Sequence, residues 1–318
     1  MSISKDYRKI FETEIDSEVR KNIKIYDKDI DIHLFQPLSH NCEQICNNSC
    51  THKCYKTLGS IMRKNIVFYS YGESEIVDNY NNGMFSDLNK AVAYAYRQRL
   101  PKRKPKQDGL PSEVLFDLII QTLLPNAYKL AVRTIMRQND NNEIKGYDLT
   151  YFTKENGQTT LWLGQAKLGS KQYCKDGIKD DLDTKYNASY LSNQIYFLAD
   201  KPCGLTDEAK EITQLINKLN MINALEDESK RAIELLKCFL DNGIQINIPC
   251  LLAYDKNSVY KDINNLQKEI EKETKWAKNN FNKIFNFQSI TPKLLFFIFP
   301  LEDIEKLRGD DGFYAGLH

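Results

Sequence analysis

Residues 161–171 read LWLGQAKLGSK, an apolar run that ends with an amide and an ammonium, Gln165 and Lys167. Successive side chains of a β-strand point to opposite faces of a sheet, so residues two positions apart share a face. Two polar groups on one face, at the end of an apolar strand, indicate a site whose chemistry depends on the residues opposite.

A tight hairpin would place an acid opposite this pair. The dipeptide Asn-Gly at 156–157 is the preferred sequence of a two-residue type I′ turn. With that turn, Glu155 pairs with Gln158, and Asp148 lies directly opposite Gln165. Directly opposed residues have Cβ atoms about 5 Å apart. The sequence therefore predicts an acid, an amide oxygen and an ammonium at one end of a hairpin.

This combination suits phosphate chemistry with a divalent cation. Asp148 and Gln165 offer oxygens to a hard ion such as Mg²⁺ or Mn²⁺, and the carbonyl of Ala166 can supply a third ligand. Lys167 can orient and help deprotonate the attacking water, or stabilise charge that grows on a phosphate. Glu113, on an upstream helix, could add a carboxylate, although the helix dipole alone favours an acid in a first turn. The alternative is a solvated polar pair on an ordinary hairpin.

Four of the eight cysteines are spaced four residues apart, at Cys42, Cys46, Cys50 and Cys54. On one straight helix the first and last would be about 18 Å apart, too far to share a metal. A break at 47–49 would bring two Cys-x₃-Cys pairs together as a four-cysteine zinc site, with His40 and His52 as reserve ligands. An iron–sulfur cluster, reduced thiols on an amphipathic helix, and disulfides are the alternatives.

A second local feature is the stretch RQRLPKRKPK, residues 97–106. The net charge of the chain is only +1, so binding to nucleic acid must come from a local patch such as this one. Its two prolines oppose an ordinary helix, and the alternative reading is a solvated linker. The candidate DNA-binding residues are Arg97, Arg99, Lys102, Arg103, Lys104 and Lys106.

Helices and strands alternate along the part of the chain that must position these groups. Apolar spacing and capping residues predict helices at 86–100, 111–125, 175–187, 207–222, 227–240 and 259–283. Apolar runs bounded by turn residues predict strands at 65–71, 128–138, 144–152, 159–167, 194–200, 244–255 and 293–301. Residues 1–60 are expected to be irregular. This order predicts an α/β fold with a mixed sheet flanked by helices.

The bulk properties describe the class of protein. The chain has 318 residues, of which 42% are hydrophobic and 27% charged, as expected of a soluble globular protein with one large or two modest domains. The polar N-terminus does not resemble a signal peptide, and the longest strongly apolar run, at 294–299, is too short to span a bilayer. We therefore expect a cytoplasmic protein that does not enter a membrane.

Four of the residues named above resemble the site of the PD-(D/E)xK nuclease superfamily. In that pattern an acid on a helix precedes an Asp and an acid-x-Lys triplet across a hairpin, and the matching residues are Glu113, Asp148, Gln165 and Lys167. Gln165 departs from the pattern because it replaces the usual acid, as in Mrr-like restriction enzymes. The replacement removes one negative charge, which should weaken metal binding.

Longer segments narrow the family. GLPSEVLFDLII, KGYDLTYF, LWLGQAKLGSKQYCKDGIKDDL, IPCLLAYD and FFIFPL follow one another within residues 60–305. In order and spacing they are similar to the Hachiman anti-phage effector family, HamA. The resemblance implies a DNA-cleaving subunit that works with a helicase partner, HamB. It also implies a restriction-endonuclease-like core at 108–318, with an N-terminal extension at 1–107 that holds the cysteines and the basic stretch.

Two other functions stay open at this point. Gln165 favours a nuclease-fold module that has lost catalysis and binds DNA or a partner. Asp148 and Lys167, by contrast, favour an active enzyme that hydrolyses phosphodiester bonds. A stand-alone restriction endonuclease is the third possibility, and a neighbouring helicase gene would count against it.

Overall fold

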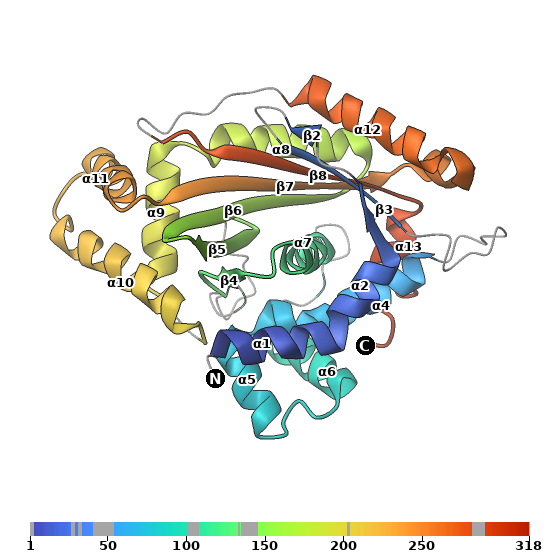
Figure 1. The fold of residues 1–318 in the computed structure, drawn as a ribbon, viewed down its shortest axis with the longest axis horizontal. Coiled ribbons are helices and arrows are strands. Elements are labelled where there is room, and N and C mark those ends of the chain that lie inside the picture. Colours follow the sequence, from blue (N-terminus) through green and yellow to red (C-terminus); the bar gives the residue numbers. More distant parts are fainter. Residues whose placement is uncertain are drawn as a thin grey trace.

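The structure is a computed structural model, and it describes residues 3–26, 29–30, 34–40, 54–100, 103, 108–132, 134, 146–201, 204–281 and 290–317. Within these residues, eight strands form one mixed sheet with helices on both faces (Figure 1). The predicted class, a mixed α/β sheet flanked by helices, is therefore confirmed. No helix in the described part of the chain is long and apolar enough to cross a membrane.

The strand order is β1-β3-β8-β7-β6-β5-β4, with β2 paired to β3. The central strands β3, β8, β7 and β6 run parallel, whereas β5 and β4 continue the sheet in antiparallel fashion. Parallel strands covered on both faces explain the nearly continuous apolar runs of β7 and β8. The strands are β1 Ile23–Ile25, β2 Asp29–Ile30, β3 Leu34–His40, β4 Ala127–Lys129, β5 Leu149–Glu155, β6 Gln158–Gly169, β7 Gln245–Asp255 and β8 Lys293–Leu301.

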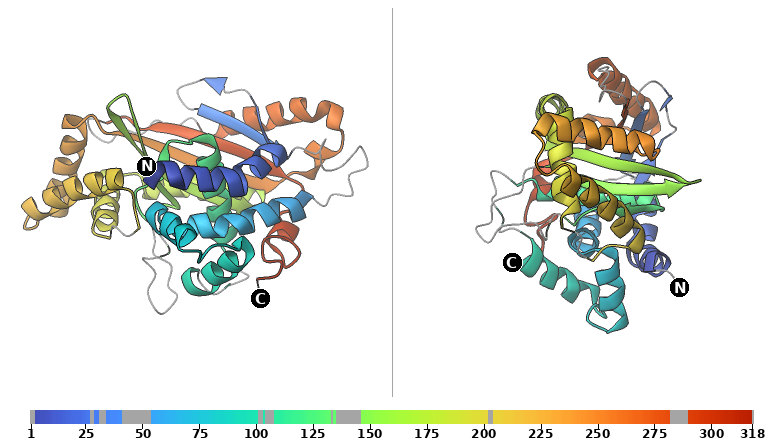
Figure 2. Two further views of the ribbon diagram at one scale, coloured as in Figure 1. Left: turned by 60° about the horizontal axis from the view of Figure 1, so that its bottom comes forward. Right: turned by 90° about the vertical axis from the view of Figure 1, so that its left-hand side faces the viewer.

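Two layers of helices cover the sheet. One layer, with α1 and α4 to α7, packs on the face that we call the α7 face, and α8 to α12 pack on the opposite α8 face. The helices α9, α10 and α11 stand at one end of the sheet and come to the front in the right-hand view of Figure 2. The helices are α1 Ile3–Phe11, α2 Ser17–Asn22, α4 Cys54–Ser70, α5 Glu73–Asn81, α6 Leu88–Arg99, α7 Leu110–Leu123, α8 Lys171–Thr184, α9 Ala188–Ala199, α10 Asp207–Ile222, α11 Glu228–Asp241, α12 Leu266–Asn280 and α13 Ile304–Arg308.

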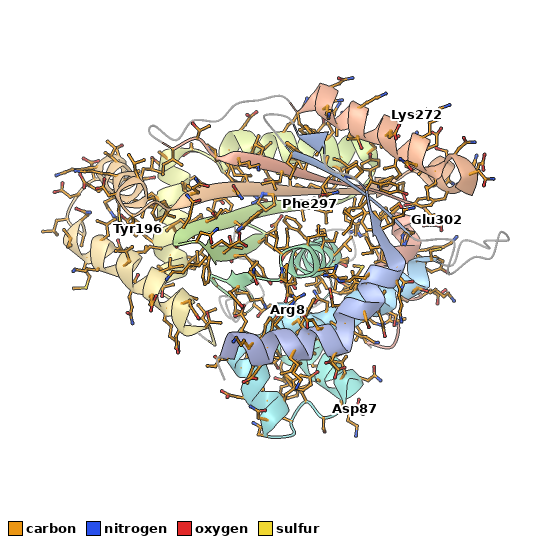
Figure 3. The ribbon with its side chains drawn as sticks, in the orientation of Figure 1. Arg8, Asp87, Tyr196, Lys272, Phe297 and Glu302 are labelled. Carbon is orange, nitrogen blue, oxygen red and sulfur yellow. The ribbon has the colours of Figure 1, made fainter. Side chains whose placement is uncertain are left out.

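Alternating side chains of the central strands divide the core into two parts. On β8, Phe296 and Ile298 point to the α8 face, and Phe297 points to the α7 face, where its ring lies 6.3 Å from that of Phe116 (Figure 3). Both faces are thus apolar, and a polar side chain on either face of β6 is surrounded by apolar neighbours. This burial makes the polar residues of β6 conspicuous.

The prediction that residues 1–60 are irregular is wrong for the described part. Apolar residues recur every four positions at Tyr7, Phe11, Ile15 and Val19, and they form one buried stripe along α1, a π-helical turn and α2. The charged residues between them obscured this stripe in the sequence. Because β3 pairs with β8, the two predicted regions, 1–107 and 108–318, contribute strands to one sheet.

Two predicted strands are helical. Residues 65–71 fall mostly in α4, and residues 194–199 belong to α9. Short apolar runs are ambiguous, because a buried helix and a buried strand can have the same composition. The predicted strand at 128–138 is shorter, since β4 ends at Lys129.

Candidate functional site

The hairpin between β5 and β6 has the predicted register. Asn156 and Gly157 have φ values of +50° and +79°, as a type I′ turn requires, and Glu155 pairs with Gln158. The ladder ends where Leu149 pairs with Gly164, and the Asp148 N–H donates to the Gly164 carbonyl at 2.8 Å. Asp148 therefore lies just before β5, at the position opposite Gln165.

Asp148 and Gln165 are each held by a backbone group from the other side of the hairpin. One carboxylate oxygen of Asp148, Oδ2, accepts the Ala166 N–H at 2.9 Å. The Gln165 side chain is fully buried on the α8 face, and its Nε2 donates to the Gly146 carbonyl at 3.2 Å. Its Oε1 accepts a hydrogen bond from Lys185 Nζ at 2.9 Å. The amide is thus fixed with its oxygen directed toward α8.

Lys167 also reaches α8, where it meets an acid. Its Nζ lies 2.5 Å from Oδ2 of Asp181, and Oδ1 of the same carboxylate lies 2.8 Å from Lys185 Nζ. The lysine stem crosses α8 at Gly177, where a Cβ would fall 2.9 Å from Lys167 Cε. A glycine inside a helix costs about 1 kcal/mol relative to alanine. Here it makes room for the lysine.

The charge state of Lys167 follows from these contacts. Burial lowers its pKa, but the neighbouring carboxylates of Asp148 and Asp181 outweigh burial, and the pKa lies above the ordinary value of 10.5. The side chain is therefore an ammonium at neutral pH. An ammonium can donate hydrogen bonds to a phosphate and stabilise its charge, whereas it has no lone pair with which to act as a base.

Glu113 lies elsewhere. It is buried in the first turn of α7, on the α7 face, where its carboxylate accepts a hydrogen bond from the Tyr69 hydroxyl of α4. Ser112, in the same turn, donates its hydroxyl to the Gly109 carbonyl at 2.6 Å. The structure brings together Asp148, Gln165 and Lys167 on the hairpin, and it places Glu113 with the other helical layer.

The oxygens of this cluster fit a loosely held Mg²⁺ better than a structural metal. In the described part of the chain, no three or more Cys, His, Asp or Glu side chains gather in a way that could hold a metal. Mg²⁺ in phosphate-processing sites needs less, because it binds through one or two carboxylates and keeps waters or substrate phosphates as its other ligands. Asp148 and Gln165 offer a carboxylate and an amide oxygen of this hard type, and Ala166 remains the predicted carbonyl ligand.

Most of the cysteine cluster, namely Cys42, Cys46, Cys50 and His52, lies outside the described residues. Cys54 begins α4 and is buried beside Val259 and Tyr260. His40 ends β3, with its ring 5.4 Å from that of Phe299, and burial lowers its pKa to about 4. Metal binding by the cluster stays a prediction.

The basic stretch is partly described. Arg97 is exposed on α6. Arg99 pairs with Glu75 at 2.9 Å, and Arg103 lies 4.2 Å above the Tyr314 ring and pairs with Asp310. Lys102, Lys104 and Lys106 lie outside the described residues. Two of the six predicted DNA-binding side chains therefore have partners within the chain.

Sequence reasoning missed Asp181 and Lys185. A signal was present, because Asp181 follows the buried Cys174 and Ile178 at helical spacing and so lies on the buried side of α8. The exposed acids Asp180 and Asp183 beside it obscured that signal.

Comparison with known proteins finds one protein family that matches most of the chain. A family model described as HamA matches residues 36–315. The matched range contains most of β3 and all of β4 to β8, and it includes the site residues Asp148, Gln165, Lys167, Asp181 and Lys185. Among curated proteins, none matches the chain.

Proposed function

The chain belongs to the HamA family, as its sequence predicted, and we propose that it is the metal-dependent DNA nuclease subunit of a two-component Hachiman anti-phage defence system. The observation that carries this proposal is the hairpin register, which sets Asp148 opposite Gln165 and Lys167 on the same face. The order of helix α7, hairpin β5–β6, helix α8 and parallel β7 supports a restriction-endonuclease-like core of the PD-(D/E)xK type.

The proposed chemistry is hydrolysis of a phosphodiester bond. Asp148, Gln165 and the Ala166 carbonyl would hold Mg²⁺ or Mn²⁺, which when bound polarises a phosphate and lowers the pKa of water. Lys167 donates hydrogen bonds to the phosphate and offsets the charge that develops there. Its raised pKa keeps it protonated for this role over the physiological range.

Asp148→Ala tests the proposal in the full-length protein. The change removes a carboxylate of the site, so cleavage of plasmid DNA with Mg²⁺ should fall at least about 100-fold. DNA binding measured with EDTA and the melting temperature should stay close to wild type. Asp180→Ala is the matched control, because it removes an exposed acid of α8. Cleavage by Asp148→Ala at the rate of the control would contradict the assignment.

A second function is a nuclease-fold module without catalysis. The bond from Lys185 to the Gln165 oxygen favours it, because an ammonium already takes the ligand that the ion would need. Gln165→Glu separates the two functions. For an active nuclease, the added charge should tighten Mg²⁺ dependence, whereas an inactive module should cleave no DNA with either residue.

The partners of the active form would be DNA and a HamB-like helicase subunit. Co-purification with the product of a neighbouring helicase gene tests the second partner. A stable complex supports the two-component system, and DNA cleavage at specific sites without any helicase would instead indicate a stand-alone restriction endonuclease.

The cysteine cluster is a separate proposal. We propose that Cys42, Cys46, Cys50 and Cys54 bind zinc, with an iron–sulfur cluster as the alternative. Purified protein should contain about one zinc per chain, or show the brown colour of iron–sulfur. Elemental analysis that finds neither metal would leave a helix with plain thiols.

A further inference from the structure

The charges at the site do not balance when Lys185 is counted together with the predicted residues Asp148 and Lys167. Asp148 is one negative charge, and Lys167 and Lys185 are two positive charges within the same cluster. A divalent cation would enter a region with a net positive charge, which opposes its binding. Asp181 supplies the missing negative charge, and it lies in ion-pair contact with both lysines.

Two oxygens from different elements already converge on one cation. Lys185 Nζ lies 2.9 Å from Oε1 of Gln165 on β6 and 2.8 Å from Oδ1 of Asp181 on α8. Asp181 is 5% exposed and Gln165 is fully buried, whereas the Lys185 side chain is 22% exposed. The oxygens are thus fixed inside the protein, and the lysine that joins them reaches solvent and can leave.

The end of α8 is tied to the hairpin by independent contacts. The Tyr186 hydroxyl donates to the Leu163 carbonyl at 2.9 Å, and the Tyr147 hydroxyl donates to the Lys185 carbonyl at 3.0 Å. These bonds hold the backbone around Asp181 in place even if the Lys185 side chain moves. The acid is therefore preorganised without help from the lysine.

We propose that Asp181 is the second metal-binding carboxylate of the site, in place of the acid that Gln165 replaces. The Lys185 ammonium, which contacts both Asp181 and Gln165, competes with the ion for these oxygens. This inference rests on the proposed metal-dependent function and adds a residue that the nuclease pattern lacks. It requires opposite effects from Asp181, in the last turn of α8, and Lys185, which caps that helix.

Binding of Mn²⁺ to the full-length protein without DNA tests this, by isothermal titration or by the electron paramagnetic resonance of the ion. Asp181→Asn should weaken Mn²⁺ binding at least about tenfold. Lys185→Met should strengthen it about fivefold or more, because a competing positive charge is gone. Asp180→Asn and Lys179→Met, at exposed positions of α8, are the matched controls and should bind as wild type does.

A second variant, in which the carboxylate is moved from position 181 to position 165, distinguishes the loss of a metal ligand from a loss of folding. The double variant Gln165→Glu with Asp181→Asn returns the carboxylate to β6 and should restore Mn²⁺ affinity to within about threefold of wild type. If Asp181→Asn binds Mn²⁺ as its control does, Asp181 only positions Lys167. If Lys185→Met does not strengthen binding, the lysine is not a competitor, and either result overturns the inference.

The outcomes separate this inference from the proposed function. Wild-type protein that binds Mn²⁺ through Asp181 but cleaves no DNA would contradict the nuclease function alone. Protein that cleaves DNA while Asp181→Asn binds Mn²⁺ normally would contradict the inference alone. A wild type that binds no Mn²⁺ would overturn the inference whatever its effect on DNA.

Discussion

Two buried polar clusters lie against opposite faces of the same sheet. The α8-face cluster comprises Asp148, Gln165, Lys167, Asp181 and Lys185. The α7-face cluster comprises Tyr7, Asn65, Asp117, Gln121 and Tyr151. Both interrupt apolar packing, but they differ in how their charges are satisfied.

Neutral groups satisfy the one charge of the α7-face cluster, the carboxylate of Asp117. Asp117 accepts hydrogen bonds from Asn65, Gln121 and Tyr151 at 2.8, 2.6 and 2.5 Å. Nearby, Lys129 is 3% exposed, and its ammonium donates to backbone carbonyls at the C-terminal end of α4, where the helix dipole favours a cation. Such contacts cannot be exchanged for a ligand without loss of the packing around them.

Opposite charges satisfy one another on the α8 face. The side chains of Lys167 and Lys185 are 18% and 22% exposed, so both can reach solvent. An ion or a phosphate can therefore replace one partner of an ion pair while the fold stays intact. This difference fits a structural role for the α7-face cluster and supports the proposal that the α8-face cluster is the chemical site.

The same substitution on the two faces gives the largest contrast. Lys167→Met should lower DNA cleavage about 100- to 1,000-fold and leave the midpoint of urea unfolding nearly unchanged. Lys129→Met should instead lower the free energy of unfolding by about 3 kcal/mol, because it leaves carbonyls at the end of α4 without a donor. Equal losses of unfolding free energy in the two variants would contradict the proposed difference between the two clusters.

Asp117→Ala tests the α7 face further. Three buried donors lose their common acceptor, so the free energy of unfolding should fall by about 4 kcal/mol. Urea unfolding followed by circular dichroism measures this loss, with Asp180→Ala as the exposed control. A loss below about 1 kcal/mol would mean that water or neighbouring groups replace the acceptor.

His40, which packs against Phe299 on the α7 face, adds a test by pH. Its pKa falls from 6.5 in the unfolded chain to about 4 when buried, so the unfolded chain binds the proton more readily between these values. Stability should therefore fall by up to about 3 kcal/mol as pH drops from 6.5 to 4. Glu73, with its pKa raised by burial to about 6, gives an opposite trend.

His40→Phe isolates the histidine, because the trend from Glu73 is common to both proteins. The aromatic contact with Phe299 is kept while the titratable group is lost. The difference in unfolding free energy between wild type and variant should change across this pH window. A constant difference would show that His40 does not titrate there.

Substitutions in the basic stretch, residues 97–106, should have the smallest effects on DNA binding and on stability. Lys102→Ala with Lys104→Ala should weaken binding to all DNA sequences alike and reduce the slope of log affinity against log salt by about two. Arg103→Ala should mainly lower stability, by about 1 kcal/mol, because Arg103 stacks on Tyr314. If neither DNA affinity nor helicase-subunit binding changes in the double variant, the stretch is a solvated linker.

The hairpin could be predicted residue by residue because its geometry is local. An Asn-Gly turn fixes the register, and the register alone sets Asp148 opposite Gln165. Long amphipathic helices such as α10 were also predicted with their observed bounds. The hairpin was predicted correctly from the residues of its turn, and α10 was predicted correctly from the regular spacing of its apolar residues.

The contacts with α8 could not be predicted in the same way. Helical spacing from Cys174 and Ile178 puts Asp181 on the buried side of α8, but whether it reaches Lys167 depends on how α8 crosses the sheet, and the sequence does not set that angle. Gly177 was a second local clue, because a helix tolerates an interior glycine where a neighbour must come close. The helical state of residues 194–199 likewise depends on burial against α10 and α11.

The central claim is that the α8-face cluster performs metal-dependent DNA hydrolysis. The most direct test incubates supercoiled plasmid with the purified chain, with and without the helicase subunit, in Mg²⁺ or in EDTA. We expect nicked and linear DNA with Mg²⁺, no products with EDTA, and no products with Lys167→Met in either buffer. Intact plasmid under every condition, or cleavage that persists with EDTA or with Lys167→Met, would contradict the claim.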